Sequence, residues 1–233
     1  MIALTIDIET TGFLNFDDRT HLLRDDCELV EFAYIRHDYD PTNKTSRFID
    51  SGTLYFYKDY YVLDNKAADI HKLTREFLEP YKKDFEANLL KMAAILTSAV
   101  IVGKNSKSFD IPFIENFLNK HAKGSLDFAV AFNVAKVPLM SFQKYLGHID
   151  IQQVLYKDFQ DWFYIEQGNP VKGKKKFGTL EQYVNWLNLK DEADKLYDSL
   201  PNKRSQEYHT GLYDVCCTHV LFLYCLEHQI GGF

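Results

Sequence analysis

Two acidic side chains, Asp7 and Glu9, end the first strongly patterned segment of the chain. Apolar residues at positions 2, 4, 6 and 8 alternate with small or polar ones, and this period of two predicts a β-strand over residues 2–9. Both carboxylates then lie on one face of the strand, about 6.5–7 Å apart. Two acids this close repel unless a cation lies between them. Their hard oxygen ligands suit Mg²⁺ or Mn²⁺.

Two further acids and a histidine could join this pair in a folded chain. Asp110 follows an apolar run, residues 99–103, that predicts a buried strand, and it opens a predicted helix, so a role as a simple helix cap is the alternative. Asp214 lies on a predicted C-terminal helix over residues 210–227, five residues after His209. Five helical steps would leave those two side chains about 140° apart. We therefore expect His209 in the turn before the helix, with capping of that helix as the alternative role.

The remaining pattern predicts one α/β domain over residues 1–233. Further strands are expected at 28–36 and 52–57, a helix with one apolar stripe at 85–96, and another helix after the capping box at 179–182. This order of elements favours a mixed sheet flanked by helices. Residues 123–148 and 158–177 are longer than a usual connection, and we interpret both segments as insertions that could contact substrate.

Four short motifs resemble, in order, those of the DEDDh (DnaQ-like) branch of the DEDD exonuclease superfamily. They are D-I-E-T-T-G at 7–12, D-I-H-K-L-T at 69–74, N-S-K-S-F-D at 105–110 and H-T-G-L-Y-D-V-C-C-T at 209–218. The other branch has Tyr four residues before the last Asp, where this chain has Thr210. Asn105 precedes Asp110 by five residues, as in Trex-like enzymes, whereas many proofreading subunits have a spacing of four.

The resemblance implies a fold and a reaction. The fold would be the RNase H-like exonuclease fold, a mixed five-stranded β-sheet flanked by α-helices. The reaction would be cleavage of phosphodiesters from a 3′ end, with two divalent ions, Mg²⁺ or Mn²⁺, as cofactors. Asp7 would bridge both ions, and Asp110 would hold the second. Glu9 and Asp214 would complete the ion that binds the attacking water, and His209 would take the proton from that water.

The same resemblance assigns six residues to contacts with nucleic acid: Thr10, Thr11, Gly12, Phe13, His71 and Asn105. The first three would meet the terminal nucleotide through backbone and hydroxyl groups, and the last would position the sugar–phosphate chain. Phe13 would stack on a base, and His71 would line the pocket of the 3′-terminal nucleotide. Packing within the protein is the alternative for these two rings.

Composition limits the remaining possibilities. The 233 residues carry a formal charge of −6, with 46% hydrophobic and 26% charged residues, as expected for a globular protein. This balance excludes a protein that coats duplex nucleic acid by bulk charge, but not an enzyme that binds a few nucleotides at a metal site. The four cysteines lack zinc spacing, and neither a signal peptide nor a membrane span is predicted. We expect a cytoplasmic protein of a bacterium or a phage-infected host cell.

Several functional alternatives stay open at this point. DNA proofreading or trimming at single-stranded or frayed 3′ ends is favoured over RNA trimming, and a polymerase could bind in trans. A non-catalytic nucleic-acid-binding module on the same fold is disfavoured, because all five predicted catalytic residues are present. A nucleotide-binding doubly wound domain would need a glycine-rich phosphate loop, which the sequence lacks. The lysines at 172 and 174–176 could steer single strands or form a solvated loop.

Overall fold

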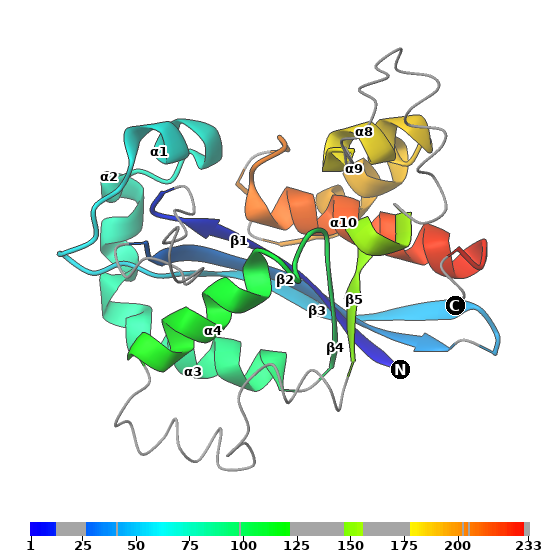
Figure 1. The fold of residues 1–233 in the computed structure, drawn as a ribbon, viewed down its shortest axis with the longest axis horizontal. Helices are drawn as coiled ribbons and strands as arrows, with labels where there is room; N and C mark the ends of the chain where they lie inside the picture. The colour runs from blue at the N-terminus through cyan, green and yellow to red at the C-terminus, as the bar shows by residue number, and fades with distance from the viewer. Residues whose placement is uncertain are drawn as a thin grey trace, which may run out of the picture.

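A mixed β-sheet of five strands, in the order β3-β2-β1-β4-β5, forms the centre of the molecule (Figure 1). The computed structural model describes residues 1–12, 27–40, 42–97, 99–121, 147–155, 178–201, 203–204 and 206–230. The strands are β1 (Ile2–Thr10), β2 (Leu29–Asp40), β3 (Thr45–Tyr55), β4 (Val100–Gly103) and β5 (His148–Asp150). β2 runs antiparallel to both β1 and β3, whereas β4 runs parallel to β1 and β5 parallel to β4. The predicted α/β fold with a mixed five-stranded sheet is confirmed.

Helices cover both faces of this sheet (Figure 1). One face carries α3 (Phe85–Leu96) and α4 (Asp110–His121), and the other carries α8 (Leu180–Trp186), α9 (Lys190–Ser199) and α10 (Gly211–Glu227). Between β3 and α3 the chain forms α1 (Asn65–His71), α2 (Arg75–Leu78) and the 3₁₀ helix η1 (Glu79–Asp84). Each face has its own cluster of buried apolar side chains. The site described below therefore rests on a packed scaffold.

The alternation along β1 decides which face carries the acids. Leu4, Ile6 and Ile8 pack with the cluster under α3 and α4, whereas Ala3 packs with the cluster under α10. Thr5 shares the second face, where its Oγ1 lies 3.3 Å from Nδ1 of His219 of α10. Because strand side chains alternate, positions 7 and 9 continue the α10 face toward the end of β1.

Most predicted elements are found, with different bounds for two strands. β2 continues to Asp40, four residues beyond the prediction, and β3 runs from Thr45 to Tyr55, whereas a strand at 52–57 was predicted. Residues 45–49 of β3 are exposed at the edge of the sheet, so they lack the alternation between apolar and polar residues that identifies a half-buried strand. The helices predicted at 85–96, from Asp110, after Thr179 and at 210–227 are confirmed, including the capping box of Thr179 and Gln182.

The fifth strand was not predicted from the residue pattern. β5 has three residues, fewer than the run of four or more by which a strand is identified in sequence. Its first residue, His148, is also the last residue of the predicted insertion 123–148. The rest of this insertion, apart from residue 147, and the whole of 158–177 with its lysines lie outside the described residues. No helix in the described part of the chain is long and apolar enough to cross a membrane.

Candidate functional site

Three carboxylates meet at the end of β1. One oxygen each of Asp7, Glu9 and Asp214 lies within 4.8 Å of the other two. Period-two geometry places the first two on the α10 face, and the first turn of α10 brings Asp214 over them. The structure thus brings together residues separated by more than 200 positions, as the order of the motifs predicts.

Gly211 allows this approach of α10 to the sheet. A Cβ atom at this position would lie 3.0 Å from Cβ of Ala33 and 3.1 Å from the carboxylate of Glu31. Distances near 3.0 Å are tighter than normal carbon contacts, so a larger residue would push the helix away from β2. The backbone N–H of Gly211 also donates to the buried carboxylate of Glu31, which ties the helix N-terminus to the sheet.

Asp214 has one oxygen in use and one oxygen without a partner. Its Oδ2 accepts a hydrogen bond from the backbone N–H of His209 at 3.0 Å. Its Oδ1 is buried and has no hydrogen-bond partner among the described residues. A buried, unpartnered acceptor costs free energy unless another group satisfies it. A metal ion shared with Asp7 and Glu9 would do so.

Asp110 approaches the end of β1 from the other face of the sheet, the face that α4 covers. It is the first residue of α4, is buried, and accepts hydrogen bonds from its own backbone N–H and from that of Ile8 in β1. Its charge raises the pKa of Asp7 and of Glu9, so the four acids act on one another electrostatically. Asp110 lies outside the tight group of three, which leaves room for a role at a second ion.

The electrostatics of the site favour binding of cations. Burial, followed by repulsion from the neighbouring carboxylates, raises the pKa of Asp7 and of Glu9 well above the usual range. Burial also raises the pKa of Asp110 and of Asp214 to about 7. Protons or divalent cations would relieve this repulsion. An all-oxygen donor set matches Mg²⁺ or Mn²⁺ in preference to softer metals.

His209 lies in the turn before α10, as the spacing to Asp214 predicts. Its side chain is exposed, and its backbone adopts a left-handed conformation with φ +66°. A non-glycine residue with positive φ is uncommon and is tolerated here because the N–H points at Asp214. The side chain is therefore accessible to solvent, on a residue whose backbone is bonded to a carboxylate of the site.

The predicted nucleotide-contacting residues of the first motif hold the loop after β1. Thr10 Oγ1 donates to the carbonyl of Gly12 at 2.7 Å, and Thr11 Oγ1 accepts from the backbone N–H of Glu28 at 2.9 Å. The carbonyl of Thr11 accepts from the N–H of Asp64. Both hydroxyls thus shape the backbone beside the acids, and a contact of this segment with a terminal nucleotide stays a prediction. Phe13 lies outside the described residues.

His71 is buried and bonded to backbone at both ring nitrogens. Nδ1 accepts from the N–H of Leu73 at 3.0 Å, so Nε2 carries the proton and donates to the carbonyl of Thr10 at 3.1 Å. Burial lowers the pKa of this histidine to about 4, which keeps the ring neutral. This geometry gives His71 the packing role that the sequence left as the alternative, and its contact with a nucleotide stays a prediction.

Asn105 occupies a tight turn after β4. Its backbone has φ +61°, its N–H donates to Asp150 at 2.9 Å, and its side-chain carbonyl accepts from Gln152 at 3.1 Å. The turn depends on Gly103, because a Cβ there would lie 2.5 Å from Cβ of Ser106. Asn105 is therefore held beside the acids, and its contact with the sugar–phosphate chain stays a prediction.

Sequence reasoning missed the pair Glu31 and Arg204. Glu31 faces Glu9 across the β1–β2 register and is fully buried, and Arg204 donates to its Oε2 at 3.2 Å. Arg204 also donates to the carbonyl of His71 at 2.7 Å. Only the antiparallel register places Glu31 beside Glu9, so no spacing within the sequence could have identified it.

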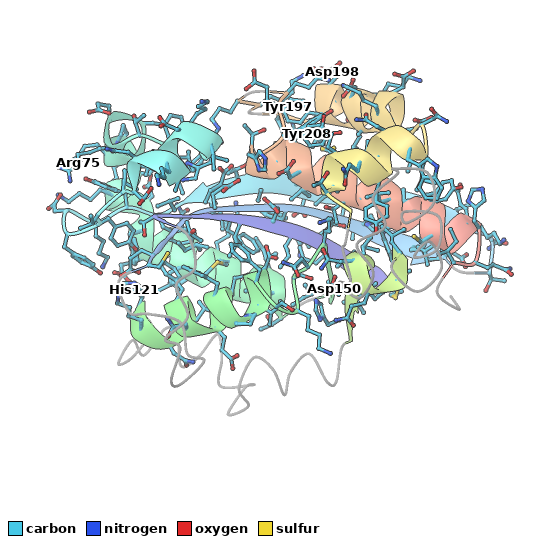
Figure 2. All side chains as sticks on the ribbon, turned by 45° about the horizontal axis from the view of Figure 1, so that its top comes forward. Arg75, His121, Asp150, Tyr197, Asp198 and Tyr208 are labelled. Atoms are coloured by element: carbon cyan, nitrogen blue, oxygen red, sulfur yellow. The ribbon has the colours of Figure 1, made fainter. Side chains whose placement is uncertain are left out.

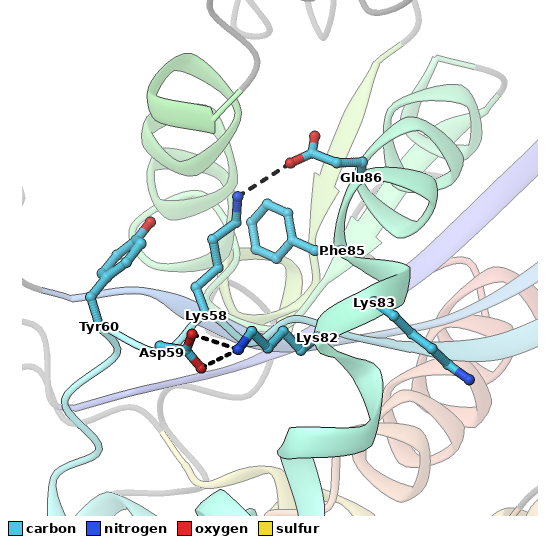
Figure 3. Close-up of a pocket in the computed structure, with 7 residues that line it drawn as sticks. All are labelled: Lys58, Asp59, Tyr60, Lys82, Lys83, Phe85 and Glu86. Atoms are coloured by element: carbon cyan, nitrogen blue, oxygen red, sulfur yellow. Dashed lines mark hydrogen bonds and ion pairs between the residues drawn. The ribbon is translucent and has the colours of Figure 1, made fainter.

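A separate groove of about 290 Å³ lies away from the carboxylates, between the segment after β3 and the start of α3 (Figure 3). Lys58 and Lys82 line it, but each forms an ion pair, with Glu86 and Asp59 respectively. The ammonium of Lys58 also lies 4.0 Å from the ring centre of Phe85. Two of the three lysines that line the groove are thus already paired with acids.

This chain resembles known proteins in its fold. No family model matches it, and no curated protein matches its sequence. Solved structures do match: Escherichia coli exonuclease I in complex with a dT13 oligonucleotide aligns over 98% of this chain, with a TM-score of 0.58 and 15% identity. The chain shares the fold of the aligned part of exonuclease I.

Two other solved structures support the same fold. Exonuclease I from Methylocaldum szegediense aligns over 98% of the chain, with a TM-score of 0.57 and 16% identity. Cell-death related nuclease 4 (CRN-4) aligns over 99% of this chain and 65% of its own, with a TM-score of 0.53 and 13% identity. The chain spans about two-fifths of the length of exonuclease I, 41% for both the E. coli and the M. szegediense protein.

Proposed function

We propose that the protein is a metal-dependent 3′–5′ exonuclease of the DEDDh type that removes nucleotides from single-stranded or frayed ends of DNA. The observation that carries this proposal is the meeting of Asp7, Glu9 and Asp214 within 4.8 Å, with an unpartnered oxygen of Asp214 among them. Asp110 beside this group and the exposed His209 complete the five residues of the motifs. The fold shared with exonuclease I agrees with this proposal.

The residues fit a pair of divalent ions. Asp7, Glu9 and Asp214 would hold the ion that carries the attacking water, and Asp110, with Asp7 as the shared ligand, would hold the other. Such ions supply an activated water and stabilise the attacking and leaving oxygens of an in-line displacement. Burial on a rigid strand and two helix starts keeps the four carboxylates in place before any ion binds.

The other side chains position groups and move a proton. His209, exposed in the turn before α10, would accept the proton of the attacking water, while its backbone N–H fixes the carboxylate of Asp214. Glu31 would anchor the start of α10 through the N–H of Gly211. Arg204 would connect Glu31 to the backbone carbonyl of His71. This network would hold the start of α10, which carries the proposed metal ligand and follows the proposed base, against the sheet.

DNA is the favoured substrate. The E. coli exonuclease I structure that this chain resembles is a complex with dT13, and CRN-4 is described as a cell-death related nuclease. The net charge of −6 agrees with recognition of a strand end at bound metals in place of wide electrostatic contact with a duplex. RNA trimming is the second candidate, because the carboxylate chemistry is the same for both sugars.

Digestion of end-labelled oligonucleotides tests the proposal. We expect stepwise shortening of 5′-labelled single-stranded DNA and release of labelled mononucleotide from 3′-labelled DNA, both dependent on Mg²⁺ or Mn²⁺ and abolished by EDTA. Matched RNA strands decide between the two substrates. Circular single-stranded DNA, which has no end, should stay intact. Release from the 5′ end, or full activity in EDTA, would contradict the proposal, and binding without cleavage would favour the non-catalytic alternative.

A further inference from the structure

Lys104 is a half-buried cation held at the edge of the carboxylate site. It follows Gly103, the last residue of β4, and β4 runs parallel to the strand that carries Asp7 and Glu9. Its ammonium donates a hydrogen bond to Oε1 of Gln152 at 3.2 Å, the one hydrogen bond that Lys104 Nζ makes among the described residues. An ammonium has three N–H donors. Lys104 therefore keeps donors that no side chain of the described chain uses.

The support of Lys104 is rigid. Gln152 spans Lys104 and Asn105, because its Nε2 donates to Oδ1 of Asn105 at 3.1 Å. The carboxylate of Asp150, at the end of β5 (Figure 2), accepts the backbone N–H groups of Asn105, Lys107 and Gln152 at 2.9–3.1 Å. These bonds fix the turn after β4 and the segment after β5 together. The ammonium of Lys104 is thus positioned by a hydrogen-bond network that includes Gln152, Asn105 and Asp150.

The charge of Lys104 acts on the site without being neutralised by a direct contact. Burial lowers the pKa of Lys104 below its usual value, and the charges of Asp150, Asp7, Asp214 and Asp110 partly oppose this shift. In the described part of the chain no ion pair joins Lys104 to any of these carboxylates. A partly buried cation that is attracted by four acids, yet donates only to a neutral amide oxygen among the described residues, is an unusual arrangement for a purely structural lysine.

We propose that Lys104 binds the terminal phosphodiester of the nucleic-acid strand, the linkage to be cut, through a charge-assisted hydrogen bond to a non-bridging oxygen. This proposal rests on the proposed function, and it assigns Lys104 a role that the four motifs do not. Lysine acts on phosphate as a point charge and tolerates small shifts of the anion. That property suits a linkage that advances by one nucleotide after each cut.

The charge balance of the site supports this assignment. Four carboxylates match the charge of two divalent ions, so the loaded site alone has no net charge with which to attract a phosphodiester. Asp150 has its own charge stabilised by three backbone N–H groups. Lys104 would therefore supply the single positive charge that complements the single negative charge of the linkage.

The test compares binding of two single-stranded oligodeoxynucleotides by wild-type protein and by Lys104→Met. One oligonucleotide has only phosphodiesters, and the other has an uncharged methylphosphonate at the terminal 3′ linkage. Binding is measured in Ca²⁺, with a gel to verify that the strands stay intact. We expect Lys104→Met to weaken binding of the all-phosphodiester strand by about 10- to 100-fold, the range for a charge-assisted hydrogen bond. Binding of the methylphosphonate strand should change less than about threefold, because the charge that Lys104 recognises is already absent.

Two variants and one further strand make the comparison specific. Lys107→Met removes an exposed lysine three residues away and should affect both strands equally and weakly. Lys104→Arg keeps the charge and should bind the all-phosphodiester strand at least tenfold more tightly than Lys104→Met. A methylphosphonate at the second linkage should leave the effect of Lys104→Met intact. Melting temperatures of all variants verify the fold, and Lys104→Gln replaces Lys104→Met if the latter does not fold.

The outcomes separate this proposal from the proposed function. If wild-type protein digests DNA from the 3′ end but Lys104→Met weakens binding of both strands equally, Lys104 only supports the turn and the proposal is wrong. The proposal is also wrong if a methylphosphonate at the second linkage, and not at the terminal one, removes the effect of Lys104→Met on binding. If wild-type protein binds the strands with the expected dependence on Lys104 but does not cleave them, the assignment of Lys104 stands and the exonuclease function fails. If it neither binds nor cleaves, both are wrong.

Discussion

The backbone N–H of His209 donates to Oδ2 of Asp214 at 3.0 Å, across the turn that starts α10. This bond occupies one carboxylate oxygen and leaves Oδ1 buried and unpartnered next to Asp7 and Glu9. It also ties the backbone of His209 to that carboxylate. A proposed general base and a proposed metal ligand are thus joined through the main chain, so replacing the imidazole need not disturb the carboxylate.

Asp214→Asn should stabilise the metal-free protein at alkaline pH. Burial raises the pKa of Asp214 to about 7, whereas an unfolded aspartate has a pKa near 3.9. The folded state therefore binds more protons between about pH 4 and 7, so this group makes the free energy of unfolding fall as pH rises through that range. In EDTA we expect only a small difference in melting temperature at pH 5, about one pH unit above the pKa of the unfolded aspartate. At pH 8 we expect the variant to melt a few degrees higher, since about 1 kcal/mol corresponds to 2–4 °C at this chain length.

Magnesium should reverse this difference. Divalent ions bind the folded wild-type site and stabilise it, whereas the variant lacks one carboxylate. Thermal denaturation of both proteins at both pH values, in EDTA and in Mg²⁺, gives the four differences in melting temperature that are needed. Asp198→Asn, at a mostly exposed carboxylate on α9, is the matched control and should show neither effect. A pH-independent difference between wild type and Asp214→Asn would show that the acids do not repel one another as described.

The sequence was sufficient for those parts of the site that depend on local geometry. Alternation along residues 2–9 predicts that Asp7 and Glu9 share a face, and the five-residue spacing predicts that His209 precedes the helix carrying Asp214. The meeting of β1 with α10 followed only from the order of the motifs, because neither element encodes its partner. Glu31 could not be predicted, since its place beside Glu9 depends on a strand register set by the whole β1–β2 pair.

The same reasoning explains what was missed in the fold. β5 is recognisable only by its pairing with β4, because three residues carry too little pattern. This pairing also brings Lys104, in the turn after β4, next to Gln152, in the helical segment that follows β5. Long-range pairing thus determines the two features that the sequence did not predict, strand β5 and the position of Lys104. Local propensity determined the rest, including the capping box of Thr179 and the first residue of α4.

His209→Asn should abolish most of the activity and preserve the fold. Asparagine tolerates the left-handed backbone at this position better than alanine does, so the turn and its bond to Asp214 should persist. Loss of a general base lowers rates by about 10²- to 10⁴-fold. Single-turnover digestion and melting temperature are measured on the same preparation. A folded His209→Asn protein with an unchanged rate would remove His209 from the mechanism and leave it as a structural turn residue.

Gly211→Ala should impair stability and activity together. The new Cβ would lie 3.0–3.1 Å from Ala33 and Glu31, so the start of α10 must move away from β2 and carry Asp214 with it. Overpacking of this kind costs about 1–3 kcal/mol. Gly12→Ala is the control for stability, because its Cβ would make an ordinary contact of 3.5 Å with Asp64. Denaturant titrations of both variants should show a lower midpoint for Gly211→Ala alone, and equal midpoints would mean that α10 can shift at no cost.

The buried pair His37 and His219 should limit stability in acid. Their rings meet edge to face with centroids 4.3 Å apart, and neither nitrogen of His37 has a hydrogen-bond partner in the part of the chain that the structure describes. Burial lowers the pKa of His37 to about 4 and that of His219 to about 3, against about 6.5 in an unfolded chain. The unfolded state therefore binds more protons below pH 6.5. The free energy of unfolding should fall as pH drops from 6.5 toward 4, by up to about 1.4 kcal/mol per pH unit for each histidine.

His37→Phe tests this origin of acid sensitivity. The variant removes one titrating ring and keeps an aromatic side chain against Phe222, whose ring centre lies 5.8 Å from that of His37. We expect His37→Phe to be at least as stable as wild type at pH 8 and to lose less stability between pH 7 and 5, with Mg²⁺ present to hold the carboxylates constant. His228→Gln, at an exposed histidine after α10, should keep the wild-type dependence on pH. Parallel stability curves for wild type and His37→Phe would mean that His37 is not buried in its neutral form.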